Sequence, residues 1–152
     1  LNSPMLKEWC ECEVNNGASC LVIDLAVCKG MDSTFMGTMA GLAMRLTKLP
    51  GGMLQVAEPG EKNRNSLEDL GLDALMQIDP VDAVWRGQIQ DVREKLKPCN
   101  RANGLLQRAD QAPHVLDAHK KLCEADERNT RKFGAVLDFL EAEVKAKTAG
   151  KE

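Results

Sequence analysis

A nearly continuous apolar run followed by an apolar helix pattern is the strongest feature of the sequence. Residues 21–27 are almost all apolar and rich in β-branched side chains, which is typical of a central parallel strand covered on both sides. A short turn follows, and apolar residues then recur at helical spacing over 36–46. Gly37 and Gly41 lie one turn apart in this helix, so we expect the helix to lie close to the sheet.

Strand and helix patterns alternate through the rest of the first half. The Ser3-Pro4 pair predicts the start of a helix over 4–14, with Trp9 and Cys10 facing inward. Further patterns predict a strand over 53–57, a helix over 61–70 and a short strand over 74–78. Such alternation is typical of parallel strands joined by right-handed crossovers. Residues 1–80 therefore predict a small α/β domain.

The second half of the chain is helical in its pattern. Residues 81–96 place apolar side chains on one stripe, as in an amphipathic helix. After a polar connector over 99–113, a long helix is predicted over 114–147, apolar at both ends and polar over 124–132. It would pack on its own domain at one end and on a partner at the other. A helical hairpin lying on its own domain is the interpretation that we prefer, and residues 81–152 form a helical extension in either case.

Charge and hydropathy exclude several function classes. The net charge is −3, with 20 basic and 23 acidic residues mixed along the chain, and the sequence has no Tyr and only two Trp. A nucleic-acid partner is therefore not expected, because it would require a basic patch and stacking aromatics. No apolar run approaches the length that a bilayer needs, and no signal peptide is visible. We expect a cytoplasmic protein without direct membrane insertion.

The six cysteines do not form a recognisable metal motif. Cys10 and Cys12 are two residues apart on a helix and point to different faces, and the sequence has no C-x-x-C pair. Cys20 and Cys28 flank the first strand and are expected in the core. The alternative is half of a metal site formed by His119 and Cys123, with Cys99 as a third ligand. We predict no metal and no cofactor.

Three short polar residues, Asp32, Ser33 and Thr34, precede the central helix and can each cap it. Two interpretations of Ser33 stay open on its chemistry alone. In the first it is a plain N-cap. In the second it is a phosphoacceptor, since a phosphate there would meet free backbone N–H groups and the positive end of the helix dipole.

These stretches resemble the STAS domain, the family of bacterial anti-sigma factor antagonists and of related domains attached to anion transporters. The resemblance covers about residues 1–80. The residues that carry it are Asp24 and Leu25 on the strand, Asp32, Ser33, Thr34 and Gly37 in the turn, and Gly71, Leu72 and Asp73 before the last strand. It implies a STAS-like small sheet, mixed or parallel, with packed helices, followed here by a helical C-terminal extension.

The resemblance implies a regulatory protein-binding module in signal transduction and transcription regulation. Ser33, or alternatively Thr34, would be phosphorylated by an anti-sigma factor that is also a serine kinase. The unphosphorylated protein would bind this partner through Asp32, Ser33, Thr34, Phe35, Met36 and Gly37. The alternative is a constitutive STAS adaptor subunit of a transport or signalling complex, with no phosphorylation switch.

The sequence departs from the family pattern in two places. Phe35 and Met36 stand where the family usually has glycine and leucine. The family also opens with two strands before its first helix, whereas this sequence begins at that helix, so we treat its start as truncated. The outer edge of the predicted sheet would then be bare. We expect another chain or upstream residues to cover it, and self-association through this edge or the C-terminal helices is a further possibility.

Catalysis has little support in the sequence. The segment 30–37 is neither a dinucleotide-binding nor a Walker loop, and no nucleophile stands in a recognisable local motif. Ser33 as a nucleophile would need a base, and the two histidines, His114 and His119, both lie in the helical extension. We therefore predict that the protein is not an enzyme.

Overall fold

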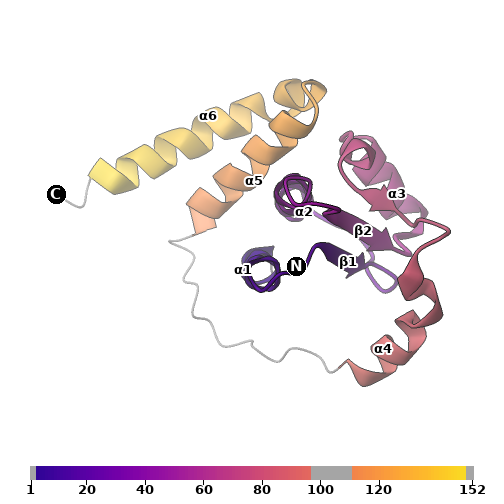
Figure 1. The fold of residues 1–152 in the computed structure, drawn as a ribbon. Coiled ribbons are helices and arrows are strands. Elements are labelled where there is room, and N and C mark those ends of the chain that lie inside the picture. The colour runs from indigo at the N-terminus through magenta and orange to yellow at the C-terminus, as the bar shows by residue number, and fades with distance from the viewer. Residues whose placement is uncertain (1–2, 97–110, 150–152) are drawn as a thin grey trace.

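The protein is an α/β structure built on a three-stranded parallel sheet (Figure 1). The computed structural model describes residues 3–96 and 111–149. The strands are β1 (Cys20–Asp24), β2 (Met53–Ala57) and β3 (Gln77–Ile78), in the order β1-β2-β3. This confirms the α/β class and the strand at 53–57, and it shortens the other two predicted strands.

Six α-helices and two short 3₁₀ turns complete the described chain. The helices are α1 (Ser3–Asn15), α2 (Ser33–Leu46), α3 (Gly60–Glu68), α4 (Ile89–Lys95), α5 (Gln111–Ala125) and α6 (Arg128–Ala149). The 3₁₀ turns are η1 (Leu72–Ala74) and η2 (Val84–Gly87). No helix in the described ranges has the length and apolar character needed to cross a bilayer.

The main core lies on one face of the sheet. Crossovers of the same hand, running in the same direction along the sheet, put α2 and α3 on the same side. Alternate strand residues point to this side, and they pack in one cluster with residues of α1, α2, α3 and α5. The strand residues in that cluster are Leu21, Ile23, Leu54 and Val56. From α5, Leu122 joins them with no exposed surface, so the hairpin formed by α5 and α6 shares the core of the sheet domain.

The prediction that the first strand is central is wrong. Among the described residues β1 pairs only with β2, so it lies at the edge of the sheet and β2 occupies the centre. Val22 is 40% exposed and Cys20 is exposed as well, because both point to the face that α1 and α2 do not cover. Apolar content alone could not distinguish an edge strand with one apolar outward residue from a central strand.

The segment after β3 covers part of the second face of the sheet, over β2, and it is not the single helix predicted over 81–96. Arg86 turns back and donates to the carbonyl oxygens of Asp79 and Pro80, at 2.9 and 2.7 Å. This closes a turn, which leaves Val81 and Val84 more than 80% exposed. Trp85 lies on the sheet instead, with its Nε1 donating to Gln55 at 2.9 Å.

The continuous helix predicted over 114–147 is wrong and the preferred interpretation, a helical hairpin, is confirmed, because the chain reverses within the polar stretch and forms two helices. Asp126 accepts the backbone N–H of Arg128 through its side chain at 2.8 Å, and its carbonyl accepts the N–H of Asn129 at 2.9 Å. These bonds start α6 as a separate helix. Figure 1 shows the resulting α5–α6 hairpin beyond α2, on the side away from the sheet.

The first helix forms as predicted but with a different buried face. Cys10 and Val14 are buried, whereas Trp9, which was expected inward, is 60% exposed. Consecutive helix residues lie about 100° apart, so burying Cys10 turns Trp9 toward the rim of the sheet.

Candidate functional site

Ser33 is the first residue of α2, but it does not cap the helix. Asp32 holds the N-cap position, and its side chain accepts the backbone N–H of Phe35 at 2.7 Å. The interpretation of Ser33 as a plain N-cap is therefore wrong. Its hydroxyl is available for another contact.

That contact is with His119 of α5, whose Nε2 lies 3.0 Å from Ser33 Oγ. The other ring nitrogen, Nδ1, lies 2.7 Å from the carbonyl oxygen of Val115. A carbonyl can only accept, so Nδ1 carries the hydrogen and Nε2 of the neutral ring is an acceptor. Ser33 therefore donates its hydroxyl hydrogen to His119. This bond joins the start of α2 to a helix 86 residues away.

A second histidine joins α5 to two other helices. His114 Nε2 lies 3.1 Å from Ser3 Oγ of α1 and 3.4 Å from Thr38 Oγ1 of α2. Burial, and next the positive charge of Lys7, lower the pKa of His114, while Asp117 opposes this shift. The neutral ring is thus the form that fits between the helices.

α2 and α5 approach each other closely at Gly37. A Cβ atom built on Gly37 would overlap with the backbone carbonyl of Ala118, whereas one on Gly41 would lie 3.3 Å from the side chain of Lys121. We expected these glycines to let α2 approach the sheet. They face α5 instead. The missing side chains do allow a close contact, as expected, but the contact is with α5 and not with the sheet.

The six predicted partner-binding residues do not form one exposed surface. Asp32 is exposed, and Ser33 and Thr34 are half-buried. The remaining three are buried: Phe35 and Met36 belong to the core cluster, and Gly37 lies beneath α5. Contact with a partner through Gly37 therefore requires α5 to move.

Sequence reasoning placed both histidines in the extension without connecting them to Ser33. A signal was present, because five residues of α5 recur at i, i+1, i+4, i+5 and i+8, which is one helical face. These residues are His114, Val115, Ala118, His119 and Leu122. Small and histidine side chains on such a face indicate a close helix contact with polar groups opposite.

The Ser33–His119 pair has the atoms of a nucleophile and its base, but the surroundings do not favour that chemistry. His119 is only 4% exposed and packs its ring edge-to-face on Phe133, with centroids 5.2 Å apart. Its Nδ1 partner is a carbonyl rather than a carboxylate. Neither residue lines any of three pockets found in the described chain. The arrangement suits a hydroxyl that holds two helices together.

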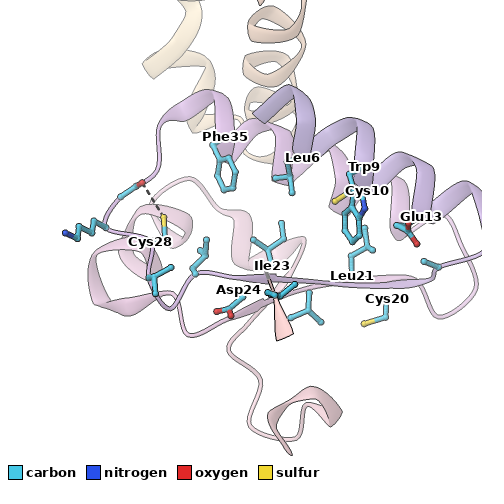
Figure 2. A pocket seen from close by; sticks show the side chains of 17 residues that line it. Leu6, Trp9, Cys10, Glu13, Cys20, Leu21, Ile23, Asp24, Cys28 and Phe35 are labelled. Carbon is cyan, nitrogen blue, oxygen red and sulfur yellow. Dashed lines mark hydrogen bonds between the residues drawn. The ribbon is translucent and has the colours of Figure 1, made fainter. Parts of the chain in front are cut away.

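The largest of those pockets is a groove of about 930 Å³ beside the edge strand. Figure 2 shows α1 above β1, with Leu6 and Cys10 of the helix and Leu21 and Ile23 of the strand lining the space between them. Ser33 does not line this groove, whereas Phe35, two residues further along α2, does. The expectation that another chain or upstream residues cover the sheet edge stays a prediction.

Within the described residues, no group of three His, Cys, Asp or Glu side chains could hold a metal ion. Cys99, one of the three residues of the alternative metal site, lies outside those residues. Cys20, which was expected in the core, is exposed, whereas Cys10 is buried. Burial, followed by the charges of Glu11 and Glu13, raises the pKa of Cys10 to about 11, so this thiol stays protonated.

Comparisons with known proteins found no match to this chain among protein-family models, curated proteins or solved structures.

Proposed function

We propose that this protein is a non-enzymatic regulatory binding module, similar to the STAS anti-sigma factor antagonists, in which phosphorylation of Ser33 controls helix docking on α2. The observation that carries the proposal is the hydrogen bond from the Ser33 hydroxyl to His119. It makes a modifiable side chain part of the contact between α2 and a covering helix. The anti-sigma factor or serine-kinase partner follows from the resemblance of residues 1–80 to that family.

A phosphoryl group on Ser33 is incompatible with this contact. It replaces the hydrogen that Ser33 donates to His119, so the 3.0 Å hydrogen bond between Oγ and Nε2 is lost. Phosphoserine carries about −1.5 to −2 charges at neutral pH, next to the exposed carboxylate of Asp32. A carboxylate-bearing docking surface would be repelled, and His119 would lose its hydrogen-bond donor.

The helix that carries Ser33 is expected to tolerate the same charge. Ser33 is the first residue of α2, and free backbone N–H groups and the helix dipole stabilise an anion at this end. Phosphorylation would therefore change what docks on α2 without unfolding it. A reversible switch requires this combination: a helix that stays folded when Ser33 is phosphorylated and a helix contact that phosphorylation breaks.

The alternative is a constitutive adaptor, in which the Ser33 hydroxyl serves only to hold α5 in place. The same hydrogen bond supports it, because a structural contact needs no modification. Phosphorylation is the property that separates the two functions.

Phosphopeptide mapping of the protein isolated from its own cells, with Ser33 and Thr34 resolved, tests the proposal. We expect phosphate on Ser33, in an amount that varies with growth conditions. A Ser33→Ala chain expressed in the same cells should lose that phosphopeptide and serves as the control. If the peptide carries no phosphate under any condition, with phosphatases blocked, the adaptor function replaces the switch.

A further inference from the structure

The surface of α2 beside Ser33 is shaped to receive another helix. Gly37 and Gly41 remove side chains from two successive turns, and the backbone of α5 enters the gap at Ala118. Close approach of this kind needs a small residue on the incoming helix as well, because a longer side chain at the crossing point would strike α2. Ala118, 2% exposed, fulfils that need.

α5 does not completely fill the space over Gly37 and Gly41. A hollow of about 220 Å³ remains between α1, α2 and α5. Its lining is rich in charge and includes Lys7 and Arg45 on the fixed side and Asp117 and Lys121 on α5. Lys7 forms an ion pair of 2.7 Å with Asp117. Glu11 of α1 lines the hollow as well, so the lining carries charges of both signs, and Lys7 is the group that faces a carboxylate of α5.

The two halves of α5 are held by different interactions. In the first half, the close packing of Ala118 on Gly37 is joined by polar contacts: His119 to Ser33, His114 to Ser3 and Thr38, and Asp117 to Lys7. Water can replace each of these when they open. The second half is anchored by apolar burial, since Leu122 has no exposed surface and belongs to the core.

The turn after α5 adds to this anchor. Asn129 donates through Nδ2 to the carbonyl oxygens of Leu70 and Leu122, at 2.9 and 2.8 Å. Lys132 donates to the carbonyl oxygen of Asp69 at 3.0 Å. The bonds to Leu70 and Asp69 thus attach the end of the hairpin to the sheet domain through groups that lie outside the first half of α5.

We infer that residues 111–119 are the resident occupant of a helix-binding groove on α2, and that the protein's partner docks in this groove through a helix with the chemistry of α5. This rests on the proposed function for the existence of such a partner and identifies its binding element. The partner helix carries alanine or glycine over Gly37, a carboxylate opposite Lys7 and a hydrogen-bond acceptor for Ser33. Charge complementarity at Lys7 and the small-residue crossing both follow the α5 contact.

The resident helix acts as an intramolecular competitor. A partner binds only to the fraction of molecules in which the first half of α5 is displaced, so its apparent affinity falls by that fraction. Any change that weakens the α5 contact and leaves α2 unaltered then strengthens partner binding.

A labelled peptide copy of residues 111–119, the part of α5 that is displaced, serves as the probe, and its binding is measured by fluorescence anisotropy. In the full chain, Ala118→Leu pushes the resident helix from Gly37 without altering α2. Ala118→Gly keeps the crossing small and is the matched control. Asp117→Lys is a second opening variant, which places a positive charge opposite Lys7 and leaves the core intact. Urea unfolding checks that each chain is folded.

We expect the peptide to bind the Ala118→Leu chain at least tenfold more tightly than the wild-type and Ala118→Gly chains, with Asp117→Lys between them. A peptide that itself carries Ala118→Leu should not bind. Equal binding to open and closed chains, or binding to none of them, would overturn the inference.

A further experiment distinguishes the existence of the groove from the proposal that Ser33 controls binding in it. Adding Ser33→Asp to the Ala118→Leu chain should weaken peptide binding at least tenfold if a negative charge at Ser33 expels the helix. Undiminished binding would support the groove and its helical occupant while contradicting the proposed phosphorylation switch.

Discussion

Gly37→Ala should lower the free energy of unfolding by about 3 kcal/mol, a typical cost for overpacking a tight contact. The new methyl group would overlap with the backbone carbonyl of Ala118, and a backbone atom cannot rotate away as a side chain can. The α2–α5 distance must widen, which weakens the Ser33–His119 hydrogen bond and the packing of Leu122. Urea unfolding of the full chain measures the loss.

Gly41→Ala provides the matched control one turn away. Its methyl group would lie 3.3 Å from Cγ of Lys121, in a flexible side chain that can shift. Alanine is preferred to glycine inside a helix by about 0.5 to 1 kcal/mol, so stability should stay within about 1 kcal/mol of the wild type. Equal losses in the two variants would contradict the close crossing at Gly37.

Asn129→Asp should cost about 3 to 5 kcal/mol at neutral pH, the range for a buried charge without a partner. Asn129 has no exposed surface, and both of its amide hydrogens point at carbonyl oxygens. The substitution keeps the size of the side chain but sets a carboxylate against those two oxygens. The hairpin loses its polar anchor to Leu70.

The pH dependence of this variant identifies the cause. A carboxyl in this site has a pKa above its value in the unfolded chain, because burial and the facing carbonyls favour the protonated form. The penalty is therefore small below the unfolded pKa of about 4 and grows as the pH rises toward the folded pKa. Asn65→Asp, on the exposed face of α3, should change stability by less than about 0.5 kcal/mol. A penalty for Asn129→Asp that is the same at pH 4 and pH 8 would argue against a buried charge.

The local signals in the sequence predicted the strand at 53–57 and the helix that begins near Ser33. These elements rest on apolar periodicity and on turn residues, which are properties of neighbouring positions. The same signals misplaced β1 at the centre of the sheet. Apolar content gives the burial that a strand needs, but the position of a strand in a sheet depends on segments elsewhere in the chain.

For a related reason, the sequence predicted one residue of the site, Ser33, but not its partner. Ser33 was singled out from its place at a helix start, and Asp32 took the capping role that either residue could fill. The partner of the Ser33 hydroxyl, His119, lies 86 residues away, and the turn at Asp126 that brings it back was hidden in a polar stretch. Pairing across such a separation is set by tertiary packing, which no local pattern encodes.

Hydrogen exchange of the Ser33→Asp chain, compared with wild type and Ser33→Ala, tests most directly whether charge at Ser33 controls the α5 contact. We predict at least tenfold faster exchange of the amides in residues 111–119 for Ser33→Asp, and a smaller change for Ser33→Ala, which loses one hydrogen bond but gains no charge. Amides of β2 should be unchanged in both variants. Unchanged or slower exchange of residues 111–119 in Ser33→Asp would contradict the account, because Ser33 would then not govern what docks on α2.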